Sequence, residues 1–436
     1  MALGGGSFIT QNKVLPGSYI NFVSVAAASA TLSDRGVVTM PLELDWGAEG
    51  KIFMVTQEDF LKNSMKFFGY PYGDPKMKGL RDLFMNAKVL YAYRLNSGGV
   101  KASCTFATAK HAGTRGNSLK IVIQANVDDP TMFDCYTYFG DTAVDMQTVA
   151  SASGLVDNDY VDFDQTATLL VTAATPLTGG TNGSVSGTAY QSYLDAAESY
   201  RYNIMGVVTT DTTIKGLVKA FQKRMREDVG MKFQAVLHDY AGADYMGVIS
   251  VDNDTTDSGW SAASLVYWVS GAEAACAVNK SCQNKKYDGE FTVDVDYTQS
   301  DLAAAILAGK FVFHNVNGDV RVLDDINTML TTTDECGDIF KDNQCIRVID
   351  QIGNDIAVLF ATKYLGVVPN DKAGRISLWS DIVKHHEQLQ EIRAIEDFDP
   401  SDVTVEQGDT KKAVVVTDAV TTVGAMSKLY MTTVVA

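Results

Sequence analysis

The hydrophobic pattern changes along this chain, and the change limits the fold that each part can adopt. Between about residues 97 and 178, short runs of β-branched and aromatic residues alternate with turns, and helical periodicity is weak. This pattern is typical of a small β-sandwich or barrel. The strands expected in this region are 102–107, 119–125, 133–139 and 167–173. After the Gly-rich run 179–184, helix-like and strand-like segments alternate, which predicts a parallel sheet covered by helices.

The remaining parts also mix helices and strands. Residues from about 31 to 95 have the pattern of a mixed α/β segment. Near the C-terminus, apolar residues keep helical spacing over 339–360 and again over 374–393. Three strand-like runs follow Pro400, at 403–406, 413–417 and 426–435.

Strand-like segments therefore lie near both ends of the chain. A segment of this kind can add to the sheet of a neighbouring chain through main-chain hydrogen bonds, so we expect two arms that pair with other subunits. The residues expected to make these contacts are Tyr19, Ile20, Phe22, Val23 and Val25 in the N-terminal arm, and Met426, Leu429, Tyr430, Met431, Val434 and Val435 in the C-terminal arm.

Composition excludes several classes of function. The 36 Lys and Arg residues against 53 Asp and Glu give a net charge of −17, which disfavours binding to nucleic acid or to an anionic membrane. The 46% of apolar residues is enough for sizeable cores, and the length suggests about three domains. We expect no signal peptide, and the six cysteines, which form no C-x-x-C pair, indicate thiols in a reducing compartment.

Motifs for cofactors and metals are incomplete. The Gly-rich run 179–187 lacks the Gly-Lys-Ser/Thr of a phosphate-binding loop, and the acidic run 252–257 lacks the glycine and glutamate of a calcium loop. His385 and His386 are adjacent, so on a helix they point about 100° apart and cannot chelate one metal as an i, i+4 pair. We expect no cofactor and no metal, with His386 as a hydrogen-bonded histidine at an interface or in a core.

Ser261 is the best candidate nucleophile, in Gly-Trp-Ser-Ala-Ala. The sequence nearly matches Gly-x-Ser-x-Gly, and His238 or His314 would have to complete a triad. The alternative is that Ser261 caps the helix that follows it. We expect no enzyme activity; a serine hydrolase and a secreted surface-layer or adhesin protein remain the alternatives.

Several stretches in order resemble the contractile-tail sheath proteins of bacteriophages, closest to those of PBSX-like prophages and of R-type, diffocin-like bacteriocins. No single stretch is specific for this family, but the order and spacing of the stretches together are. They are Pro16–Ile20, Arg35–Val38, Leu44–Gly47, Gly113–Lys120, Leu177–Gly183, Val320–Val322, Ile326–Thr328 and Lys428–Met431.

The resemblance implies a multi-domain α/β fold. It comprises a β-sandwich domain, a subtilisin-like α/β domain without protease activity, an α+β C-terminal domain, and extended arms. The implied ranges are 1–25 for the N-terminal arm, 26–96 for an α/β segment, 97–178 for the sandwich, 179–335 for the subtilisin-like domain, and 336–436 for the C-terminal domain with its arm at 425–436.

The resemblance also implies an assembly. Hexameric rings would stack around a tail tube, and the sheath would contract from a high-energy extended state to drive the tube through a bacterial envelope. The implied partners are the chain itself, the tube protein, the baseplate and the terminator or collar proteins. Assembly would occur in the bacterial cytoplasm, before release of a phage tail or bacteriocin particle.

Moving subunits would need hinges and a surface for the tube. The glycines Gly4, Gly5, Gly6 and Gly424 are the expected hinges of the two arms. Lys384, His385 and Arg393 are basic residues of an acidic protein, and we expect them on the helix surface that faces the tube.

Overall fold

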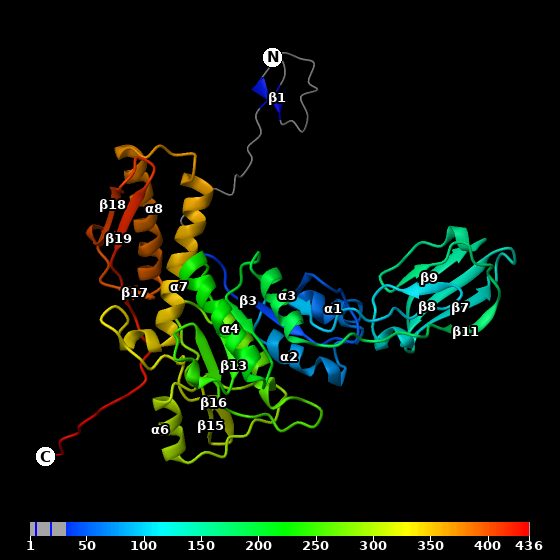
Figure 1. The fold of residues 1–436 in the computed structure, drawn as a ribbon, viewed down its shortest axis with the longest axis horizontal. Helices are drawn as coiled ribbons and strands as arrows, with labels where there is room; N and C mark the ends of the chain where they lie inside the picture. Colours follow the sequence, from blue (N-terminus) through cyan, green and yellow to red (C-terminus); the bar gives the residue numbers. More distant parts are fainter. Residues whose placement is uncertain (1–4, 7–17, 20–31, 436) are drawn as a thin grey trace. The chain divides into compact units, whose positions relative to one another are not determined.

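The computed structural model describes residues 5–6, 18–19 and 32–435, which form two compact units (Figure 1). The larger unit contains residues 34–354 and 422–436. The smaller unit contains residues 355–421 and the N-terminal residues up to 33. Gly4, Ile20, Phe22, Val23 and Val25 lie outside the described residues. Gly5–Gly6 (β1) and Ser18–Tyr19 (β2) pair as short parallel strands.

A six-stranded sheet forms the centre of the larger unit. Its order is β14-β13-β12-β3-β5-β4, and every pair is parallel except β4 with β5. The strands are β3 (Val37–Leu42), β4 (Ile52–Thr56), β5 (Val89–Arg94), β12 (Ile204–Gly206), β13 (Gln234–His238) and β14 (Val248–Val251). Residues 26–96 and 179–335, expected as separate segments, thus contribute strands to one sheet.

Helices cover both faces of this sheet. One face packs against α2 (Lys78–Phe84) and α5 (Val266–Ala275), and its core includes Leu83 and Trp268. The other face packs against α3 (Gly187–Ala197) and α4 (Thr212–Arg224), with a core that includes Tyr193. The unit also contains α1 (Gln57–Phe68), α6 (Gln299–Leu307) and the hairpin β15 (Phe313–Val316) with β16 (Asp319–Val322). The parallel sheet covered by helices is as predicted.

The region expected to be a sandwich is entirely β-rich (Figure 1). A four-stranded antiparallel sheet has the order β11-β7-β8-β9, and a second sheet pairs β10 with β6. The strands are β6 (Ala107–Ala109), β7 (Leu119–Ala125), β8 (Phe133–Phe139), β9 (Thr142–Val149), β10 (Val161–Phe163) and β11 (Thr172–Pro176). Apolar side chains such as Phe139 fill the core between them.

Two helices and a hairpin form the smaller unit. Helix α7 (Asn343–Leu359) begins in the larger unit and ends in the smaller one. Helix α8 (Lys372–Glu391) packs on the antiparallel pair β18 (Val403–Gln407) and β19 (Val414–Asp418). The Nε1 of Trp379 donates to the carbonyl of Val403 at 3.0 Å, which fixes the helix on the hairpin. The short strands β17 (Ile395–Glu396) and β20 (Thr421–Thr422) pair with each other.

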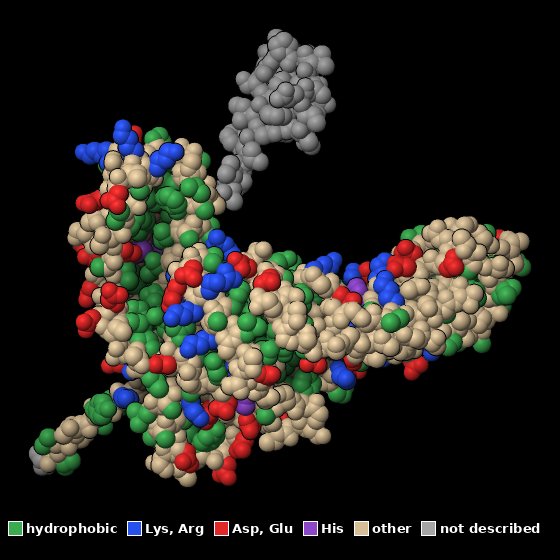
Figure 2. Space-filling model, in the orientation of Figure 1, with side chains coloured by type: hydrophobic (Ala, Val, Ile, Leu, Met, Phe, Trp, Pro, Cys, Tyr) green, Lys and Arg blue, Asp and Glu red, His purple; other side chains and the backbone are tan. Residues whose placement is uncertain are grey.

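Residues 426–435 form no strand within the chain, although a strand was expected there. Their apolar side chains are exposed instead: Leu429 is 87% exposed and Tyr430 is 89% exposed. Figure 2 shows hydrophobic side chains along this terminal segment. None of the described helices is both long and apolar enough to cross a membrane.

Candidate functional site

Ser261 acts as a helix cap. Its Oγ accepts a hydrogen bond at 3.2 Å from the amide of Ala263, at the start of the 3₁₀ helix η6 (Ala262–Leu265). Nε2 of His238 lies 2.8 Å from a carboxylate oxygen of Asp254, and no hydrogen bond joins Ser261 to a histidine within residues 32–435. The candidate triad is therefore not assembled, and the helix-cap interpretation is confirmed.

The acidic run 252–257 joins neighbouring segments through ion pairs. Asp252 accepts from the Nζ of Lys310, and Asp257 accepts from the Nζ of Lys78, each at 2.6 Å. Since Asp254 bonds to His238, each of the three carboxylates already has a protein partner. The run therefore works as a polar junction.

The Gly-rich run 179–187 packs against the chain that leaves the central sheet. A Cβ on Gly183 would lie 1.9 Å from the carbonyl oxygen of Ser97, so a side chain there would clash with backbone. The Nδ2 of Asn182 donates to Asp45 at 2.9 Å. These glycines permit a close backbone crossing rather than phosphate binding.

The adjacent histidines on α8 are both buried in the smaller unit. Nε2 of His385 lies 3.1 Å from Oδ2 of Asp355, and Nε2 of His386 lies 2.8 Å from Oδ2 of Asp418. The amide of Ser33 also donates to Oδ2 of Asp355, at 3.2 Å. The network thus joins Ser33, which lies just before the larger unit in the sequence, to Asp418 at the end of β19.

This burial corrects the prediction for His385, whose side chain is only 1% exposed and reaches no surface. Lys384 is exposed on α8, and Arg393 is exposed just beyond the end of the helix. The core position expected for His386 is confirmed. The sequence analysis could not find Asp355 as the partner of His385, because the two lie 30 positions apart.

The root of the C-terminal segment is held by Gln344, which the sequence analysis did not single out. Its Nε2 donates to the carbonyl of Val423 at 2.9 Å, and its Oε1 accepts from the amide of Ala425 at 3.0 Å. Gln344 is buried in the first turn of α7. The two bonds flank Gly424, where an added Cβ would meet no atom within 4 Å.

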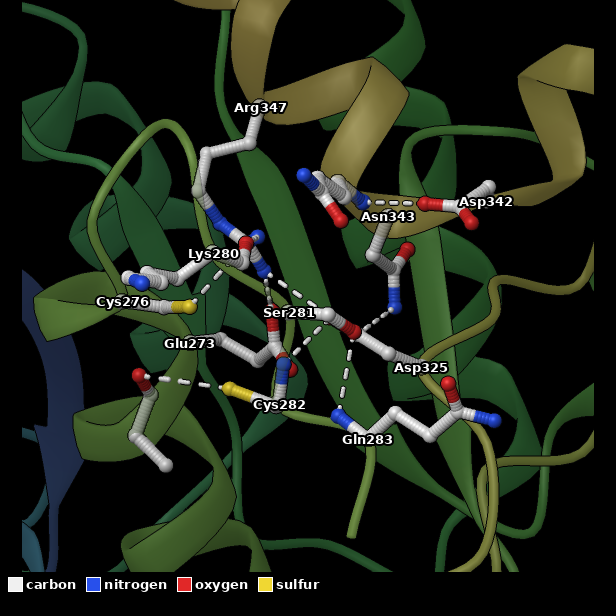
Figure 3. Close-up of polar contacts among 12 residues, drawn as sticks. Glu273, Cys276, Lys280, Ser281, Cys282, Gln283, Asp325, Asp342, Asn343 and Arg347 are labelled. Atoms are coloured by element: carbon white, nitrogen blue, oxygen red, sulfur yellow. Dashed lines mark hydrogen bonds and ion pairs between the residues drawn. The ribbon is translucent and has the colours of Figure 1, made fainter. Parts of the chain in front are cut away.

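A cluster of buried charges lies at the start of α7 (Figure 3). The Nη2 of Arg347 donates to Oε2 of Glu273 at 2.6 Å and to Oδ2 of Asp325 at 3.3 Å, while its Nη1 donates to the carbonyl of Lys280 at 2.6 Å. Asp325 also accepts from the amide of Cys282 at 2.8 Å. The cluster joins α5, the loop that follows it, and α7.

The pKa values of the two carboxyl groups in the cluster are shifted in opposite directions. Burial and the neighbouring Asp325 raise the pKa of Glu273 well above its usual value, and Oε1 of Glu273 faces no hydrogen-bond donor among the described residues. Burial also opposes ionisation of Asp325, but Arg347 and several hydrogen bonds lower its pKa overall. These shifts favour the neutral form of Glu273 and the charged form of Asp325, which lies beside Arg347.

This cluster does not have the character of a metal centre. Glu273, Cys282 and Asp325 offer atoms that lie within 4.8 Å of one another. Arg347 already bonds to both carboxyl groups, however, and its guanidinium group supplies the positive charge that a metal would bring. We assign no metal ligands there.

Comparisons with known proteins agree with this architecture. Four family models match the chain in succession. They are the tail sheath protein Gp18 domain III N-terminal region over residues 35–95, the phage tail sheath protein beta-sandwich domain over 97–182, the phage tail sheath protein central domain over 183–328, and the phage tail sheath C-terminal domain over 335–436. "Phage-like element PBSX protein XkdK" of Bacillus subtilis (strain 168) is 32% identical and covers 98% of this chain and 99% of the relative.

The chain belongs to the phage tail sheath protein family. The sheath tail protein of Desulfitobacterium hafniense has a solved structure that is 37% identical, with a TM-score of 0.81 over 95% of this chain and 99% of that one. The helical sheath of the anti-feeding prophage in its contracted state shares the fold, at 14% identity and a TM-score of 0.57 over 97% of this chain and 99% of that one.

The resemblance to sheath proteins is thus confirmed. These relatives are structural proteins and not enzymes. This tail sheath protein is a structural subunit of a contractile tail sheath.

Proposed function

We propose that this sheath protein polymerises as stacked hexameric rings around a tail tube and contracts from a metastable extended state. The observation that carries the proposal is the exposed apolar segment 426–435, which has no strand partner within the described chain. A monomer gains nothing by exposing these side chains, whereas a neighbouring subunit can bury them. Main-chain pairing also suits a subunit with a net charge of −17, because it does not depend on charge.

The β18–β19 hairpin is the proposed acceptor in a neighbouring subunit. It is a two-stranded sheet, so each strand has one edge without a partner in that sheet. Val415 and Val416 of β19 are 52% and 40% exposed and could pack against an added strand. The N-terminal arm, including Tyr19, would pair with another subunit in the same way.

The energy for contraction would be stored in the arrangement of subunits. A difference of a few kcal/mol per subunit, on the order expected between two packings of one sequence, adds up over many copies. Gly4, Gly5, Gly6 and Gly424 would let the arms stay paired while the bodies rotate. Gly424 suits this role because its surroundings leave space.

The remaining partners follow from the same assembly. We propose that Lys384 and Arg393, both exposed, contribute to the surface that meets the tube protein. The baseplate and the terminator or collar proteins would contact the two ends of the sheath. The sheath would be built in the bacterial cytoplasm and work in a released, extracellular particle. The mostly parallel central sheet, covered on both faces, supports the proposal that residues 179–335 have a subtilisin-like α/β fold.

Electron microscopy of the purified protein tests the proposal. Full-length protein is expected to form helical tubes, whereas a chain that lacks 426–436 is expected to stay soluble and folded without polymerising. Leu429→Asp is expected to act like the truncation, and Thr432→Ser, within the same segment, serves as the matched control. Long sheaths from the truncated chain would overturn the arm hypothesis.

A further inference from the structure

A cavity of about 520 Å³ lies at the carboxyl ends of two central strands in the larger unit. Its lining includes Leu42, the last residue of β3, with Glu43 next to it in the chain, and Asn96, which lies just after the end of β5. The strand order reverses at β3, because β5 pairs on one side of it and β12 on the other. Sheets of this kind bind ligands outside the carboxyl ends of their strands, beside such a reversal.

Hydrogen bonds within the protein hold one wall of the cavity in place. Asp45 accepts from the Oη of Tyr70 at 2.7 Å and from the Nδ2 of Asn182 at 2.9 Å. The Nζ of Lys76 lies 3.5 Å from Oδ2 of Asp45 and balances its charge. Glu43 is therefore the carboxylate of the lining that has no ion pair among the described residues.

Three polar groups of the lining have no hydrogen-bond partner within the part of the chain that the structure describes. They are the carboxylate of Glu43, the Nε1 of Trp260 and the hydroxyl of Tyr267. The remaining tryptophans all donate their indole N–H to a protein acceptor, and these are Trp46, Trp268 and Trp379. The unused groups at the cavity are thus available to a ligand.

The lining combines a negative charge with aromatic and apolar surface. Glu43 supplies the anion, and the rings of Trp260 and Tyr267, whose centroids lie 6.4 Å apart, offer faces that attract a cation. The Nε1 of Trp260 can only donate, so it requires an acceptor on the ligand. The buried side chains of Phe68 and Met77 line the same cavity and suit a hydrocarbon stem.

We infer that this cavity binds a small organic amine, in which a primary ammonium group and a hydroxyl or carbonyl oxygen are joined by a short apolar stem. The ammonium group pairs with Glu43 and lies against the aromatic rings, and the oxygen accepts from the Nε1 of Trp260. The inference is independent of the proposed assembly, because the lining contains no residue of either arm.

Calorimetric titration of the full-length protein with 5-amino-1-pentanol at pH 7 tests the inference. The matched probe is 1,5-pentanediol, which has nearly the same size and shape but no charge. Because Glu43 is exposed to solvent, its ion pair is of modest strength, and the amine is expected to bind about fivefold more tightly than the diol.

Two variants locate the binding in this cavity. Glu43→Gln should weaken binding of the amine about fivefold and leave the diol unchanged, which removes the preference for the charged probe. Glu58→Gln removes one exposed carboxylate on α1, outside the cavity, and is the control that should keep the preference. The amine should also change the tryptophan fluorescence of the wild type, and this change should be lost in Trp260→Phe.

Equal affinity of the wild type for the amine and the diol would overturn the inference, and this comparison holds even if a variant fails to fold. Unchanged affinity of Glu43→Gln for the amine would place the binding elsewhere on the protein. A lysine side chain of a second copy presents the same ammonium group, so sedimentation distinguishes the two sources. Release of subunits by the amine would overturn the assignment of a free amine in favour of that lysine, whereas we expect sedimentation to stay unchanged.

Discussion

The Nδ1 atoms of His385 and His386 lie 3.3 Å apart inside the smaller unit. Each Nε2 also bonds to a carboxylate, Asp355 or Asp418, so each donates its hydrogen there. Only one of the facing Nδ1 atoms can then carry a hydrogen if they bond to each other. The two rings and their carboxylate partners therefore form one buried chain of polar contacts that links Asp355 to Asp418.

Removing one imidazole should leave buried partners without hydrogen bonds. We expect His386→Ala to lower the free energy of unfolding of the smaller unit by about 2–3 kcal/mol, because His385 and Asp418 both lose a partner. Glu387→Gln, next to it on the exposed face of α8, should change stability by less than about 0.5 kcal/mol. Thermal unfolding monitored by circular dichroism measures both, and equal losses would contradict the network.

The buried charge cluster predicts costs of very different size for substitutions at two residues that contact each other, Arg347 and Glu273. Arg347→Met should cost about 3–5 kcal/mol, because it leaves the Asp325 anion buried without compensation. Glu273→Gln should cost less than about 1 kcal/mol, because burial and Asp325 raise the pKa of Glu273 toward the neutral form, and glutamine keeps an acceptor for Arg347. Urea unfolding of the full chain measures both, and a large cost for Glu273→Gln would show that Glu273 is ionised.

His111 predicts a loss of stability in mild acid. Burial, together with Lys101 and Arg94, lowers the pKa of His111 to about 4. The imidazole ring packs edge-on against Trp46, with the two ring centroids 5.0 Å apart. Between about pH 6.5 and 4 the unfolded chain binds a proton that the folded chain refuses, so the free energy of unfolding falls as pH falls, by up to about 3 kcal/mol.

His111→Gln removes this titration and is the matched variant for the test. When the pH is lowered from 7 to 4.5, the melting temperature of the wild type should fall by more than that of the variant. Asp82, whose pKa burial raises to about 6, titrates in both proteins and cancels in the comparison. A difference that is independent of pH would contradict the prediction.

Gln344 predicts how firmly the C-terminal segment is attached. Gln344→Ala should raise the hydrogen-exchange rate of the Ala425 amide about fivefold to thirtyfold, the equivalent of about 1–2 kcal/mol, because Oε1 is its acceptor. Gln407→Ala, at the exposed end of β18, is the control and should leave that amide unchanged. Unchanged exchange in Gln344→Ala would show that other contacts hold the segment.

The pattern of residues within short segments predicted individual strands of this fold, but not how distant strands pair. The expected strands 119–125 and 133–139 coincide with β7 and β8, since both are runs rich in β-branched and aromatic residues. The pattern missed β9, whose residues are mostly exposed or half-buried and therefore carry little apolar signal. It also missed the pairing of β3 with β12, because nothing in either strand specifies a partner so distant in the chain.

The candidate sites show the same division. Ser261 was predictable as a cap, because the cap contact spans two residues. The environment of His385 depends on Asp355, and the role of Gln344 depends on Val423 and Ala425, so both need the tertiary structure.

The placement of β3 in the middle of the central sheet affects how the protein is made on a ribosome. β3 pairs with β5 on one side and with β12 on the other, and the whole sandwich region lies between β5 and β12 in the sequence. Strands β3, β4 and β5 therefore leave the ribosome first, and one edge of β3 has no hydrogen-bonding partner until β12, which ends at Gly206, has been synthesised. During that interval the nascent chain is most exposed to aggregation and most dependent on chaperones.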